Sequence, residues 1–117
     1  MLIPVLASLA LAAQQAPLNP EVEADIACVA SLSAVSTALP KEEQMSVAPL
    51  VTYYVGRIDG RSPGLDLEKA LIRQLEGKSE AELNSFLQSN AQRCGNEMIA
   101  LGSRLQALGK SLTERNK

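Results

Sequence analysis

The stretch "VAPLVTYYVGRIDGR", residues 47–61, predicts the fold class of the chain. Its apolar side chains recur at steps of three and four residues, which places them on one face of an α-helix. Pro49 fits the first turn of such a helix or kinks it, and the turn-forming "RSPG" of residues 61–64 ends it near Gly60. We therefore expect a helix that begins near Glu42 or Ser46, with a buried stripe formed by Val47, Leu50, Val51, Tyr54, Val55 and Ile58.

Three further helices are predicted around this segment. The first covers about residues 20–39, because Asn19 can cap it, a proline fits its first position and a second proline follows its end. A short helix covers about residues 66–75. Ser79 and Glu82 form a capping box that begins the last and longest helix. That helix carries an apolar stripe that we expect to pack in the core, formed by Leu83, Leu87, Ala91, Cys94, Met98, Leu101, Leu105, Leu108 and Leu112.

The composition supports one small all-α domain. The 117 residues are 46% hydrophobic but only 3% aromatic, so the core must be aliphatic, and leucine, alanine and glutamate favour helix. We predict four helices in an orthogonal or bundle-like arrangement, stapled by one disulfide. The core should cover about residues 20–112.

The charge and the missing histidine exclude several functions. A net charge of −2 gives no basic patch for nucleic acid. The chain has no histidine, which removes the usual general base and the commonest metal ligand. The carboxylate pairs Glu42–Glu43 and Glu80–Glu82 lie within helices as solvated faces. We therefore predict no catalytic residues, no cofactor, no metal site and no enzymatic activity.

The N-terminus predicts an exported protein. The first twenty residues carry no charged side chain, and Ala10-Leu11-Ala12 fits the small-x-small pattern at which secretory signals are cleaved. The alternative is a buried N-terminal helix; the apolar run is too short to cross a bilayer. We expect a signal peptide at residues 1–12 and a domain at residues 13–117, located in the periplasm or secreted. No stable membrane insertion is expected after cleavage.

Export makes the two cysteines a predicted disulfide. Cys28 and Cys94 are the only pair, and each lies on the apolar stripe of a long helix. The closed loop of 67 residues corresponds to a stabilisation of about 4 kcal/mol in the chain-entropy model. In a reducing compartment the same residues would be two buried thiols.

The polar side of residues 52–61 is the candidate partner site. Tyr53, Arg57 and Arg61 lie on one side of the helix, and Arg57 can stack on the ring four residues before it. Tyrosine and arginine are enriched at binding hot spots. The alternative is helix packing, with Gly56 and Gly60 letting a second backbone approach closely and an ion pair closing the turn.

The leader, a cysteine on the first helix, "YYVGRIDG" and a late cysteine together resemble the small periplasmic HdeA-type acid-stress chaperones. The layout is also similar to the immunity proteins of type VI secretion effectors. The resemblance covers about residues 22–98. The spacing between Cys28 and Cys94 is longer than in the HdeA pattern, and the helix after the second cysteine is extended.

The resemblance implies two functions. A chaperone-like protein would bind unfolded clients in acid, where protonating 13 carboxylates turns a net charge of −2 into +11 and loosens the fold below about pH 3. An inhibitor or immunity-type protein would instead bind one specific protein through Tyr53, Arg57 and Arg61. A homodimer is a further expected assembly. The identity of any partner and the physiological trigger do not follow from the sequence.

Overall fold

The computed structural model describes residues 18–116 as four α-helices: α2 (Pro20–Ala38), α3 (Lys41–Arg61), α4 (Leu67–Leu75) and α5 (Glu80–Arg115). The predicted all-α domain of four packed helices is confirmed. The predicted signal peptide lies outside the described residues. Helix α3 begins slightly earlier than predicted, so Pro49 lies inside the helix rather than in its first turn.

The predicted caps define where the helices begin. The Asn19 side chain accepts a hydrogen bond from the backbone N–H of Glu21 at 2.8 Å, and Ser79 Oγ accepts one from the backbone N–H of Glu82 at 3.2 Å. Asp66 caps α4 in the same way. Gly77, with φ at 74°, provides the left-handed residue that turns the chain from α4 into α5.

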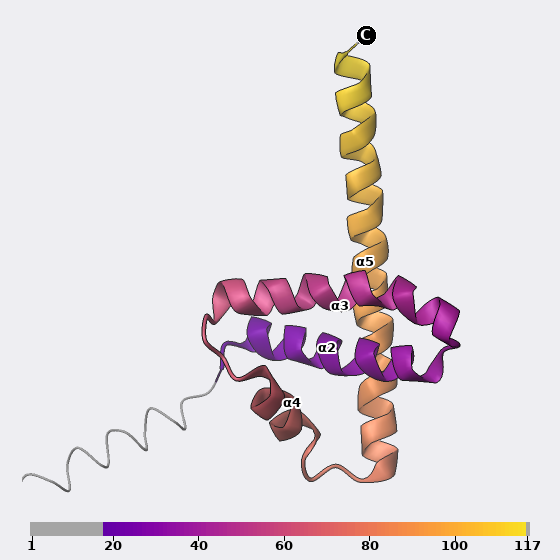
Figure 1. Ribbon diagram of the computed structural model, residues 1–117. Coiled ribbons are helices and arrows are strands. Elements are labelled where there is room, and N and C mark those ends of the chain that lie inside the picture. Colours follow the sequence, from indigo (N-terminus) through magenta and orange to yellow (C-terminus); the bar gives the residue numbers. More distant parts are fainter. Residues whose placement is uncertain (1–17, 117) are drawn as a thin grey trace, which may run out of the picture.

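Helices α2 and α3 form a hairpin, and α5 runs across it (Figure 1). Helix α2 is the centre of the domain, because it contacts all three other helices. The core therefore lies where α2, α3 and the first half of α5 meet, and α4 adds one residue to it. Its buried residues are Val22, Ile26, Cys28, Val29, Leu32, Val47, Tyr54, Ile58, Ala70 and Cys94.

The predicted disulfide joins Cys28 on α2 to Cys94 on α5, with the two Cα atoms 5.7 Å apart. Both cysteines are fully buried. The bond therefore fixes the crossing point of α5 on the hairpin. The second half of α5 continues beyond α3 and stands away from the domain (Figure 1).

Candidate functional site

Arg57 is the centre of a polar cluster at the crossing of α2, α3 and α5. Its Nε lies 3.3 Å from Asp25 Oδ2, and its Nη1 lies 2.7 Å from Glu97 Oε1. Nη1 also donates a hydrogen bond to the Tyr53 hydroxyl at 3.3 Å, and the guanidinium carbon lies 5.5 Å from the centre of that ring. One arginine on α3 therefore contacts carboxylates on both other long helices. We name Asp25, Tyr53, Arg57, Arg61 and Glu97 the arginine cluster.

Asp25 forms ion pairs with both Arg57 and Arg61, although its side chain is only 3% exposed. Its Oδ2 accepts a hydrogen bond from Arg61 Nη1 at 3.3 Å, in addition to the contact with Arg57. Burial raises the pKa of the Asp25 carboxyl above its usual value, although Arg57 and Arg61 oppose this shift. The pKa is raised because removal of the carboxylate from water disfavours its charged form more than the two guanidinium groups favour it.

Further polar contacts hold α5 on α2 and α3 beside this cluster. Arg93 Nη2 donates a hydrogen bond to the backbone carbonyl of Ala24 on α2 at 3.0 Å. Within α5, Arg93 Nη1 lies 3.8 Å from Glu97 Oε2. The Tyr54 hydroxyl donates to the carbonyl of Cys94 at 3.3 Å. Burial, and then the charge of Glu97, raise the pKa of Tyr54 to about 12, so this hydroxyl stays a donor. The first half of α5 is thus held by polar contacts as well as by the disulfide.

The structure brings together all three residues of the predicted partner site. Arg57 and Arg61 direct their guanidinium groups toward other helices of the domain, whereas the Tyr53 hydroxyl accepts its hydrogen bond from Arg57 on the same helix. The Arg57 side chain is 30% exposed. The predicted stacking of Arg57 on Tyr53 is confirmed. The geometry favours the packing interpretation of this segment; binding of a partner there stays a prediction.

Two expectations about this segment need correction. A Cβ atom added at Gly56 or Gly60 would meet nothing within 4 Å, so these glycines do not serve a close helix approach. The ion pairs of Arg57 and Arg61 also connect separate helices instead of closing a local turn. Arg57 and Arg61 pair with Asp25 on α2, and Arg57 also pairs with Glu97 on α5, so long polar side chains and not the glycines bridge these helices.

Asp25 is the site residue that the sequence interpretation missed. It lies one turn before Cys28 and Val29, and so beside the residues that point into the core. A carboxylate at a core-facing helix position requires a positive partner, because burying an unpaired charge is costly. That position was the signal available in the sequence.

The raised pKa of Asp25 predicts a specific pH dependence. The folded protein holds the Asp25 proton more tightly than the unfolded chain, so this residue adds stability as the pH falls through its folded pKa toward about pH 4. The free energy of unfolding of wild type minus that of Asp25→Asn should therefore become more positive between pH 7 and about pH 4. Urea unfolding at several pH values measures it.

Asp59→Asn is the matched control, because it removes an exposed carboxylate from α3. Its difference from wild type should change less over the same pH range. A wild-type advantage over Asp25→Asn that shrinks on acidification would show that Arg57 and Arg61 outweigh burial.

The second half of α5 exposes apolar side chains. Leu105, Leu108 and Leu112 are 57%, 51% and 61% exposed, and they share one side of the helix. Met98 and Leu101, half-buried, continue the same stripe toward the domain. We name these five residues the α5 face. The prediction that the whole stripe packs in the core is thus wrong for its last three leucines, because none of the other helices in residues 18–116 extends so far (Figure 1).

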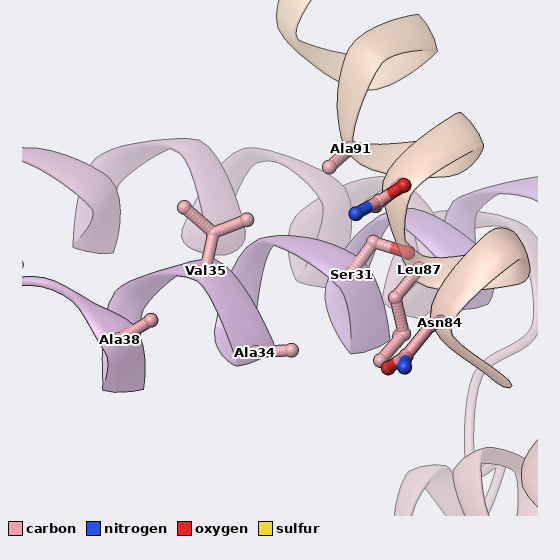
Figure 2. Close-up of a pocket in the computed structure, with 8 residues that line it drawn as sticks. Ser31, Ala34, Val35, Ala38, Asn84, Leu87 and Ala91 are labelled. Carbon is pink, nitrogen blue, oxygen red and sulfur yellow. The ribbon is translucent and has the colours of Figure 1, made fainter. Parts of the chain in front are cut away.

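An apolar groove lies between the end of α2 and the start of α5 (Figure 2). Its volume is about 430 Å³, and Val35 is 39% exposed along it. Ser31 points toward α5, and its Oγ has no hydrogen-bond partner within the described part of the chain. The lining residues are Ser31, Ala34, Val35, Ala38, Asn84, Leu87, Gln88 and Ala91.

Neither ligand type nor family follows from known proteins. Within residues 18–116, no three side chains of histidine, cysteine, aspartate or glutamate are grouped so that they could hold a metal ion, and no helix there is long and apolar enough to span a bilayer. The chain matches no protein-family model, and no similar curated protein or solved structure is found. The site must therefore be interpreted from its own geometry.

Proposed function

We propose that this is a small exported, non-enzymatic protein that binds apolar segments of unfolded proteins in a chaperone-like manner. The observation that carries the proposal is the α5 face, where three leucines in successive turns are each more than half exposed. Isolated exposed leucines are common on folded proteins, but a continuous apolar row is typical of an interaction surface.

The position of the α5 face suits it to an extended client. The second half of α5 stands clear of the other helices, so a client can reach it without displacing part of the domain (Figure 1). Full burial of a leucine side chain contributes about 1.5–3 kcal/mol, and roughly half of that remains available at each exposed leucine. Such contacts are not directional, which fits binding of many sequences with modest affinity.

The rest of the domain supports this surface. The disulfide and the arginine cluster anchor the first half of α5 to α2 and α3. When a client binds the exposed half of α5, the disulfide therefore keeps the base of that half fixed to α2. A disulfide also persists in oxidising compartments, which supports the proposed export to the periplasm or beyond.

We extend this proposal with an HdeA-like mechanism, in which acid increases the binding of clients. Full protonation of the carboxylates changes the net charge from −2 to +11, and this self-repulsion enlarges the exposed apolar surface in acid. Asp25 acts in the opposite direction, because its raised pKa favours the folded state on acidification. We therefore propose that clients bind already at neutral pH and that acid increases the binding.

Aggregation of a test protein measures the proposed activity. We expect the oxidised protein to suppress aggregation of a chemically denatured enzyme diluted into buffer at pH 7, and more strongly at about pH 3. Leu105→Gln combined with Leu108→Gln should raise the concentration needed for half protection at least about tenfold, because two exposed leucines are lost.

The matched control places two glutamines on the opposite side of the same helix, as Ser103→Gln combined with Ala107→Gln. This variant should protect as wild type does. Equal protection by both variants, or no protection by any form, contradicts the proposal. A single tight partner that binds wild type and is lost on Arg61→Ala would instead support the inhibitor-type function.

A further inference from the structure

We propose that the α5 face also binds a second copy of this chain, in an antiparallel pair of α5 helices. The inference rests on the proposed function only in using the same surface. It names a definite partner for that surface, with which clients must compete. The exposed leucines, their spacing, three glycines and the charges at the helix end together support it.

The spacing of the α5 face is that of a two-stranded coiled coil. Its residues follow one another at alternating steps of three and four, and so occupy the two seam positions of a seven-residue repeat. This repeat continues from the domain almost to the end of α5. A surface of this kind is self-complementary, because leucines of one helix fit between leucines of an identical helix related by a two-fold axis. The seam residues are Met98, Leu101, Leu105, Leu108 and Leu112.

Three glycines lie beside this seam. Gly95, Gly102 and Gly109 are seven residues apart. Gly102 and Gly109 each follow directly on a seam residue, and Gly95 follows Cys94, which lies one step before the seam. Glycine disfavours the helical state, yet an added Cβ at any of the three would meet nothing within 4 Å in one copy. The packing of a single copy gives no reason for them. A second helix that approaches the seam closely on this side would explain why these positions are glycine.

The charges select the antiparallel direction. Arg115 lies three residues after Leu112 and therefore occupies the next seam position. A parallel pair would place two copies of this arginine side by side and align the two helix dipoles. In an antiparallel pair with Leu105 opposite the second copy's Leu108, Arg115 lies level with the second copy's Met98, next to its Glu97. Glu97 has a side chain 37% exposed at the point where α5 leaves the domain, which gives each arginine an acidic neighbour.

The size of the contact limits its strength. Residues 98–115 extend over about 26 Å, and a helix is about 10–12 Å wide. Such a strip lies at or below the low end of specific interfaces, which bury about 1,200–2,000 Å² in total. We therefore expect a reversible dimer with a dissociation constant of about 10–100 µM.

Sedimentation equilibrium of the oxidised protein tests the dimer over about 1–500 µM. Leu108→Gln should weaken dimerisation at least about tenfold, and Ala107→Gln on the opposite side should leave it unchanged. Gly109→Gln should weaken the dimer although it improves helix propensity. A monomer at every concentration, or a dimer insensitive to Leu108→Gln and Gly109→Gln, would overturn the inference.

Cross-linking tests the direction. Equal amounts of Leu105→Cys and Leu108→Cys should form more covalent dimer when mixed than either variant forms alone, since the two positions face each other only in the antiparallel pair. More covalent dimer from Leu105→Cys alone would overturn the antiparallel assignment. A monomeric protein that still protects clients through its leucines removes only the dimer, and a dimer without client protection removes only the proposed function.

Discussion

Replacement of Cys28 by serine is expected to lower the free energy of unfolding by about 4 kcal/mol. The disulfide closes most of the folded chain into one loop, because the two cysteines are 66 positions apart. Its loss gives the unfolded chain back the entropy that this loop had removed. For a domain of this size the melting temperature should fall by about 15–30 °C, since 1 kcal/mol corresponds to about 4–8 °C.

Thermal unfolding of three variants checks this prediction. Cys94→Ser should cost as much as Cys28→Ser, because each removes the same constraint, and the double variant should cost little more than either. Costs that add would show that the two side chains contribute by packing rather than by the bond.

Intact-mass analysis of protein isolated from the periplasm gives the covalent state. We expect a chain that begins near Ala13 and lacks two hydrogens. A full-length chain with two alkylatable thiols would contradict both the bridge in the cell and the proposed export.

Arg57→Met is expected to be the most destabilising charge substitution, at about 3–5 kcal/mol at pH 7. It removes the cation between Asp25 and Glu97, and it leaves the buried Asp25 carboxylate with Arg61 as its remaining guanidinium contact. A buried carboxylate that loses one of its two guanidinium partners is only partly compensated, and this costs more than the lost pair itself contributes. Part of this loss should be recovered in mild acid, because protonation of Asp25 removes the charge.

The double variant Asp25→Asn, Arg57→Met separates this mechanism from simple loss of packing. We expect it to be more stable at pH 7 than Arg57→Met alone, because no buried charge is left. Arg104→Met on the exposed half of α5 is the matched control and should change stability by less than about 0.5 kcal/mol. Equal stability of the double variant and Arg57→Met in denaturant unfolding would show that the Asp25 charge is not the source of the loss.

The helices and their staple were predictable because their signals are local. Asn19, Asp66 and Ser79 each cap a helix through a backbone N–H two or three residues further on, so spacing in the sequence is enough to find them. The pairing of Cys28 with Cys94 was predictable from the cysteine count together with the expectation of an oxidising compartment. The stripe of α3 was predictable from its helical period, with Val47, Tyr54 and Ile58 buried.

The arginine cluster and the exposed half of α5 depend on tertiary structure. The contacts of Arg57 with Asp25 and Glu97 arise from how three helices cross, and no local pattern gives that geometry. Periodicity shows that a helix has an apolar face, but not which element covers it. Length gave a further signal: α5 has 36 residues and α2 has 19, so a single crossing leaves much of α5 beyond the hairpin.

The groups that stabilise the domain lie apart from the proposed binding surface. The disulfide and the arginine cluster lie at the crossing of α2, α3 and α5, whereas the exposed leucines lie further along α5. Substitutions at the leucines should therefore change binding with little effect on the melting temperature. The separation lets one measurement on the folded protein examine binding directly.

That measurement is methyl NMR of the oxidised protein at pH 7 during titration with a reduced and alkylated, permanently unfolded protein. The account predicts that the methyl signals of Leu105, Leu108 and Leu112 shift or broaden first, while those of the buried Val22 and Ile26 stay in place. Changes confined to side chains around Tyr53, Arg57 and Arg61, or no change at any methyl group, would contradict binding through the α5 face.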